Sequence, residues 1–150
     1  MHLRVPPPVQ GIVAAAIIWG VDKQWPQLAV PFPGQRIVAP LLGAVGFAIA
    51  INATFSFRKA DTTINPMKPD EASELVIEGL YEVTRNPMYL GLLLVLSGWC
   101  FWLGNPLGIA AVVLFVWYIT QYQIQPEERV LREKFGTAYD EYCQRVRRWI

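Results

Sequence analysis

Four stretches of this sequence contain no Asp, Glu, Lys or Arg, and they constrain the fold more than any other feature. They cover residues 5–21, 37–57, 87–103 and 107–124. A helix rises about 1.5 Å per residue, so each stretch approaches the length that crosses about 30 Å of hydrocarbon, the first and third being short. A water-soluble bundle would need charged faces on these helices, and the stretches have none. The sequence therefore predicts an all-α integral membrane bundle with four transmembrane helices, built as one domain over residues 1–150.

Lys and Arg are distributed unevenly among the segments that join these stretches. Eleven of the 13 lie before the first stretch, between the second and third, or after the fourth, whereas Lys23 and Arg36 lie between the first and second. The positive-inside rule then places both termini and the 58–86 linker in the cytoplasm and residues 22–36 outside. In a bacterium this membrane would be the inner, cytoplasmic one. The net charge of +1 gives no indication of nucleic-acid binding, so we expect no nucleic-acid partner.

The two cysteines point neither to a metal site nor to a structural disulfide. Cys100 lies in the third stretch and Cys143 in the tail, on the predicted reducing side. Neither has histidine partners at a metal-ligand spacing, so we expect no metal.

Two polar segments flank the hairpin that the third and fourth stretches form. The first runs from Arg85 to Gly91 and the second from Glu127 to Leu131. A tight turn at Gly104-Asn105-Pro106 joins the two stretches, so both segments should meet at one membrane face. Ionisable groups at such a place are costly and usually have a function.

Each polar segment also has a purely structural explanation. Asn86 and Pro87 suit the start of a helix, with Arg85 reaching the interface. Glu127 and Glu128 suit a helix N-terminus, where Glu128 can pair with Arg132 four residues on. Seen alone, neither segment decides between structure and function.

The tail after the fourth stretch predicts cytoplasmic amphipathic helices. Pro126 should kink or end the preceding helix. An amphipathic helix is then expected over residues 127–135, Gly136 should end it, and Thr137 with Asp140 resembles a capping box that opens the next helix.

Taken together, the two polar segments suit a zwitterionic cofactor with an aromatic ring. Carboxylates can hold an ammonium or sulfonium group, arginine can hold a carboxylate, and the faces of aromatic side chains can hold the ring and the cation. The hairpin places such groups, Gln121 and Gln125 included, at one face.

The order and spacing of these motifs are similar to those of a known superfamily. The motifs are Thr62-Thr63-Ile64-Asn65-Pro66, Gly79-Leu80-Tyr81, Arg85-Asn86-Pro87-Met88-Tyr89-Leu90-Gly91 and, in the tail, Glu127-Glu128-Arg129-Val130-Leu131, Phe135-Gly136, Tyr139, Tyr142 and Arg148-Trp149. Over about residues 36–150 the chain resembles the isoprenylcysteine carboxyl methyltransferase and phospholipid methyltransferase superfamily.

The resemblance implies an integral membrane enzyme that uses S-adenosylmethionine, releases S-adenosylhomocysteine, and has its cofactor-site core over about residues 58–150. It implies catalytic roles for Arg85, Glu128 and Arg148. The cofactor-binding residues that it implies are Tyr81, Asn86, Pro87, Tyr89, Leu90, Gln125, Glu127, Glu128, Tyr139 and Tyr142. Asn86 stands where many members have histidine, so this position cannot supply a titrating base.

The implied acceptor is lipophilic and approaches from the bilayer, while the cofactor arrives from the cytoplasm. An isoprenylcysteine-like carboxylate, a lipid amine and a thiol all remain open, and so does the oligomeric state. A rival interpretation is an NADPH-dependent membrane reductase of the sterol reductase type, which shares a related C-terminal pattern. A non-enzymatic membrane scaffold is the third possibility.

Overall fold

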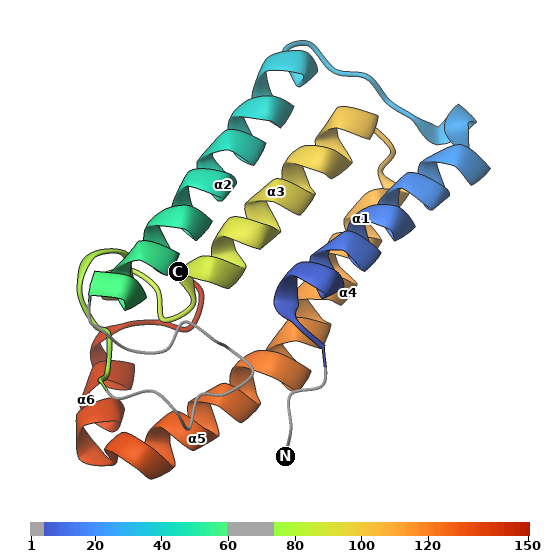
Figure 1. Cartoon of the computed structure of the whole chain (residues 1–150). Helices are drawn as coiled ribbons and strands as arrows, with labels where there is room; N and C mark the ends of the chain where they lie inside the picture. Colours follow the sequence, from blue (N-terminus) through green and yellow to red (C-terminus); the bar gives the residue numbers. More distant parts are fainter. Residues whose placement is uncertain (1–4, 60–73) are drawn as a thin grey trace.

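The chain forms a bundle of four long helices that is extended at one end by two shorter ones. The computed structural model describes residues 5–59 and 74–150, without the side chains of residues 57–59, so the predicted motif at 62–66 lies outside the described residues. The long helices are α1 (Pro7–Gln24), α2 (Gln35–Lys59), α3 (Pro87–Leu103) and α4 (Leu107–Ile119), and they pack side by side (Figure 1). A π-helical segment, η4 (Thr120–Ile124), leads from α4 into α5 (Gln125–Phe135) and then α6 (Thr137–Arg145). Single 3-10 turns, η1 (Pro26–Leu28) and η3 (Gly79–Glu82), precede α2 and α3.

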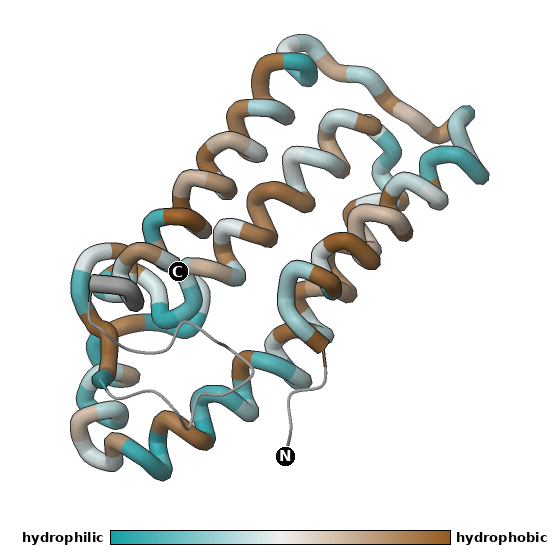
Figure 2. The backbone as a smooth tube through the Cα atoms, in the orientation of Figure 1, coloured by the Kyte–Doolittle hydropathy of each residue, from teal (hydrophilic) through white to brown (hydrophobic). Residues whose placement is uncertain are grey.

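Apolar side chains cover the outside of the bundle. Large apolar residues of α1, α2 and α4, such as Ile12, Ile37 and Val113, are exposed, and Figure 2 shows apolar positions along these helices and hydrophilic ones along α5. Segments Gln35–Ser56 and Leu107–Phe135 are long and apolar enough to cross a membrane, and α3 is a shorter apolar helix. The chain is therefore all-helical in its described parts, with two candidate membrane helices. The four-span arrangement stays a prediction.

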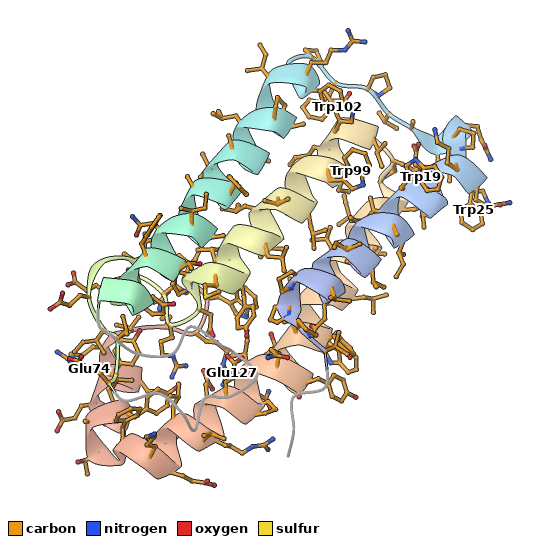
Figure 3. The ribbon with its side chains drawn as sticks, viewed as in Figure 1. Trp19, Trp25, Glu74, Trp99, Trp102 and Glu127 are labelled. Atoms are coloured by element: carbon orange, nitrogen blue, oxygen red, sulfur yellow. The ribbon has the colours of Figure 1, made fainter. Side chains whose placement is uncertain are left out.

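The two ends of the bundle differ in chemistry. Figure 3 shows Trp19, Trp25, Trp99 and Trp102 near one end and Glu127 near the other. At the tryptophan end, Gly104 ends α3 in a left-handed conformation with φ of 71°, and the buried Asn105 donates through Nδ2 to the carbonyl oxygen of Trp25 at 2.9 Å. This turn gives the predicted hairpin and ties it to α1.

Helices α2 and α3 approach so closely that only glycine fits at their crossing. A Cβ atom on Gly46 would lie 2.5 Å from the carbonyl oxygen of Gly91, and one on Gly91 would lie 2.5 Å from that of Gly46. Close contact between small residues is a common way for helices to associate in membranes. This contact fixes α3, which carries the first polar segment at its start, against α2.

The helix predicted over residues 127–135 begins two residues earlier, at Gln125, and ends at Phe135 before Gly136 as predicted. Of the two effects predicted for Pro126, a kink or a helix end, the helix end is wrong, because Pro126 lies in the first turn of α5, which continues from η4. Proline lacks an N–H, and its ring clashes with the carbonyl group four residues earlier. The wider π turn just before Pro126 accommodates both effects.

Two predicted local interactions in the tail are also wrong. The cap of α6 is Gly136, with φ of 53° and no side-chain cap, so Thr137 and Asp140 form no capping box. Asp140 instead accepts a hydrogen bond from Nε of Arg132 at 2.7 Å. Arg132 is therefore drawn toward α6 and does not pair with Glu128.

Candidate functional site

Glu128 holds two arginines from opposite ends of the polar region. Arg148 donates from Nε to Oε1 at 3.0 Å and from Nη2 to Oε2 at 2.6 Å, and Nη2 of Arg85 lies 3.3 Å from Oε1. The side chains of Glu128, Arg85 and Arg148 are 9%, 12% and 36% exposed. These hydrogen bonds to Glu128 raise the pKa of Arg148 above its ordinary value. One carboxylate facing two guanidinium groups leaves the cluster with a net positive charge.

The segment after α6 runs back along the start of α3. The backbone N–H of Arg85 donates to the carbonyl oxygen of Arg147 at 3.0 Å. The carbonyl oxygen of Arg148 accepts two hydrogen bonds, from the Thr84 hydroxyl at 3.2 Å and from Nδ2 of Asn86 at 3.0 Å. Figure 1 shows the C-terminus beside the start of α3. Asn86 precedes α3, as predicted, but its side chain does not cap the helix. It fixes the backbone that carries Arg148.

Glu127 faces a different set of side chains from its neighbour. Its Oε1 accepts hydrogen bonds from the hydroxyl of Tyr89 at 2.5 Å and from Nε2 of Gln123 at 2.8 Å. Nε2 of Gln10, near the start of α1, lies 3.3 Å from Oε1 of Gln123. This chain of polar groups links α1, η4, α5 and α3 at the base of the bundle.

Three predicted site tyrosines form a small core beside the arginines. The hydroxyl of Tyr142 donates to the carbonyl oxygen of Tyr81 at 2.7 Å, and the ring centroids of Tyr139 and Tyr142 are 6.2 Å apart. Burial raises the pKa of all three phenols, so they stay neutral. Arg85 also donates from Nη1 to Sγ of Cys143, which packs against this core.

The remaining predicted site residues make no side-chain hydrogen bond or ion pair within the cluster that the structure describes. Pro87 is buried in the first turn of α3, and Leu90 is half-buried in the next turn. Gln125 is half-buried at the start of α5, and none of the hydrogen bonds among the described residues involves its side chain. Gln121 is exposed and lies outside the cluster.

An apolar groove of about 630 Å³ opens beside the polar region, between the start of α1, α2 and α3. Its walls are mostly Pro, Phe, Ile, Leu and Val side chains, and Thr54 and Tyr89 bring the hydroxyl groups. The Tyr89 hydroxyl is the one that bonds Glu127. Tyr89 therefore touches both the groove and the polar cluster.

Sequence reasoning missed Gln123, Gln10 and Thr84. Gln123 stands four residues before Glu127, a spacing that brings side chains together on a helix and could have indicated the contact. The π segment, however, makes the direction of each glutamine side chain hard to predict. Its wider turn changes which face of the helix the following residues occupy. No sequence signal connects Gln10 or Thr84 to this region.

Comparison with known proteins identifies the family. The phospholipid methyltransferase profile matches residues 35–138. The chain is 32% identical to protein-S-isoprenylcysteine O-methyltransferase B of Arabidopsis thaliana over 102 residues, which is 68% of this chain and 52% of that protein. It is 51% identical to an uncharacterized protein of Haemophilus influenzae over 63 residues, 42% of this chain and all of that protein.

A Delta(14)-sterol reductase of Mus musculus is also similar, at 29% identity over 124 residues, 71% of this chain and 28% of the reductase. The chain spans about half the length of the plant isoprenylcysteine methyltransferases that it matches. The profile match covers most of the chain and includes α2, α3, α4, α5 and the two polar segments. The resemblance predicted from the motifs is therefore confirmed, and the chain belongs to the phospholipid methyltransferase family.

Proposed function

We propose that this protein is a membrane methyltransferase that transfers the methyl group of S-adenosylmethionine to a lipophilic acceptor. Family membership supports a methyltransferase. The observation that carries the proposal is the cluster in which Glu128 holds Arg85 and Arg148 at the end of the bundle where both polar segments meet.

The residues of this cluster fit a zwitterionic cofactor. Nε of Arg85 is buried and has no hydrogen-bond partner among the described residues, so it can donate to a carboxylate oxygen. The cluster has a surplus of positive charge, which favours the same group. Arg148 is partly exposed, whereas Tyr139 and Tyr142 are buried in the core beside the cluster. When bound, the cofactor supplies a methyl group activated by a positively charged sulfur.

The acceptor side of the proposal rests on the groove. Its apolar walls suit a hydrocarbon chain, and exposed apolar side chains on α1 and α2 suit contact with lipid. An isoprenylcysteine-like carboxylate, a lipid amine and a thiol are the candidate acceptor groups. The plant relatives carry the name of the first.

The proposed arrangement in the membrane has four spans, α1 to α4, with α5 and α6 as amphipathic helices at the cytoplasmic surface. Both termini and the cofactor site lie on that side. The uneven distribution of Lys and Arg supports this orientation.

Binding of S-adenosylmethionine to the purified protein, measured by calorimetry, tests the proposal. Glu128→Gln should weaken binding, because the two arginines lose the carboxylate that orients them. The loss of a charge-assisted contact costs about 1.5–3 kcal/mol, which is roughly tenfold or more in affinity. Glu133→Gln on the exposed face of α5 is the matched control. Circular dichroism confirms that both variants fold, and unchanged affinity in a folded Glu128→Gln protein would sink the assignment.

The similarity to a sterol reductase keeps one rival open. An NADPH-dependent reductase would bind NADPH and not S-adenosylmethionine. The same calorimetric experiment with NADPH separates the two functions, and a protein that binds neither cofactor fits a membrane scaffold.

A further inference from the structure

A buried glutamine lies at the base of the bundle, in the π-helical segment η4. Gln123 is only 1% exposed. Burying an amide among apolar helices costs free energy unless its polar atoms find partners. An apolar side chain would fill the same space without that cost, so the contacts of this amide should explain why it is there.

The amide of Gln123 binds a polar group at each of its ends. Nε2 donates to Oε1 of Glu127 at 2.8 Å, and Oε1 accepts from Nε2 of Gln10 at 3.3 Å. If the amide were turned over, its oxygen would face the carboxylate and its NH2 group would face another NH2 group. The two contacts therefore fix the orientation of the Gln123 amide, with Gln10 of α1 holding its oxygen.

Neutral donors hold Glu127 through one oxygen. The hydroxyl of Tyr89 donates to the same Oε1 at 2.5 Å, and none of the ion pairs among residues 5–59 and 74–150 includes Glu127. Rotation of the carboxylate would break the hydrogen bonds from both Tyr89 and Gln123. No hydrogen bond within this part of the chain reaches Oε2, so that oxygen can meet a cation.

The helix is distorted where this glutamine stands. Gln123 lies in the π turn Thr120–Ile124, and Pro126 follows in the first turn of α5. π turns are rare and occur frequently at functional sites. A distorted turn whose buried amide orients a carboxylate favours a functional role for Gln123 over packing alone.

We propose that Gln123 is a positioning residue of the cofactor site and acts through Glu127. It turns the carboxylate so that Oε2 meets a positively charged group of S-adenosylmethionine, and Gln10 keeps Gln123 in its donating orientation. This inference rests on the proposed function. The positive group is the ammonium or the sulfonium of the cofactor, since a carboxylate attracts either charge.

A variant that removes the donor and keeps the length of the side chain tests the inference. Gln123→Met should weaken S-adenosylmethionine binding by about tenfold or more, measured by calorimetry on the purified protein in detergent. Gln121→Met is the matched control, because Gln121 is an exposed glutamine of the same segment, and it should bind as wild type does. Wild-type affinity in a folded Gln123→Met protein overturns the inference.

A double-variant cycle separates positioning from packing. If Gln123 acts through Glu127, Gln123→Met should cost no further affinity in a protein that already carries Glu127→Gln. If Gln123 only holds the helices together, the two losses should add, and the inference fails.

S-adenosylhomocysteine identifies the group that Glu127 meets, because it keeps the ammonium and lacks the sulfonium charge. Weaker binding of both ligands to Gln123→Met indicates the ammonium. Weaker binding of S-adenosylmethionine alone indicates the sulfonium.

Gln10→Met keeps the inference testable if Gln123→Met does not fold. It removes the donor that holds Gln123 and leaves Glu127 and Tyr89 unchanged. It should weaken S-adenosylmethionine binding by less, about fivefold, because a contact between two neutral amides is lost. Wild-type affinity in a folded Gln10→Met protein overturns the inference.

Failure of this inference can be distinguished from failure of the proposed function. A wild-type protein that binds no S-adenosylmethionine refutes the proposed function itself. A Glu127→Gln protein that binds the cofactor as tightly as wild type refutes only the inference about Gln123.

Discussion

Arg85 uses its guanidinium group in two directions and leaves a third nitrogen available, which lysine cannot do. Nη2 pairs with Glu128, Nη1 donates to Cys143, and the buried Nε points to no described partner. Lysine offers a single nitrogen and no planar fork. Arg85→Lys should therefore keep the fold but lose most methyl transfer to any acceptor that wild type uses.

The matched control for this prediction is Arg36→Lys, at an exposed position near the start of α2. It should change neither activity nor thermal unfolding. Full activity of the Arg85→Lys protein would mean that Arg85 only places charge at the membrane surface.

Single residues also show how much of the candidate site can be predicted from the sequence. The sequence predicts Arg85, Glu128 and Arg148 as candidate site residues, and the structure brings their side chains together. The separate surroundings of Glu127 and Glu128 are not predictable, since adjacent residues in a motif look equivalent. Their difference depends on Tyr89 and Gln123, which come from other turns of the fold.

At the scale of helices, the α2–α3 contact is the most sensitive to a small change. A Cβ atom at Gly91 would lie 2.5 Å from the carbonyl oxygen of Gly46, and that backbone atom cannot move aside without shifting α2. Gly91→Ala should destabilise the protein by about 1–3 kcal/mol, as overpacking does elsewhere. Thermal unfolding in detergent measures the effect.

Gly20→Ala in α1 is the comparison, because a Cβ there meets nothing within 4 Å. Alanine also favours a helix over glycine by about 1 kcal/mol. This variant should unfold at the same or a slightly higher temperature. Equal stability of Gly91→Ala and wild type would show that the two helices separate more easily than their packing suggests.

The helices can be predicted from the sequence where a single strong feature determines them. The charge-free stretches predict α2 and α3 to within a few residues, and Pro87 marks the start of α3. The sequence leaves a kink and a helix end both open at Pro126, because the preference of proline to end a helix competes with the continuity of a long apolar segment. The structure has a π turn at this place, and no local sequence pattern predicts it.

For the whole molecule, the testable prediction is its orientation. With eleven Lys and Arg residues on one side and two on the other, both termini should be cytoplasmic and residues 22–36 outside. A reporter that is active only in the cytoplasm, fused after Ile150, should be active, and the same reporter inserted near Gln27 should be silent. The reverse pattern in well-expressed, folded protein would refute the orientation and place the arginine cluster on the other face.

The contacts that complete the arginine cluster join positions 58 to 64 residues apart, from Thr84 and Arg85 to Cys143 and Arg148. During synthesis, α3 therefore leaves the ribosome well before its partners in the tail exist. Until α5 brings Glu128, Arg85 has none of the protein partners described above, and Cys143 and Arg148 follow later still. The helices can gather in the membrane first, and the site closes as a separate, late event. A nascent chain halted within α5 would thus hold most of the bundle and no finished site.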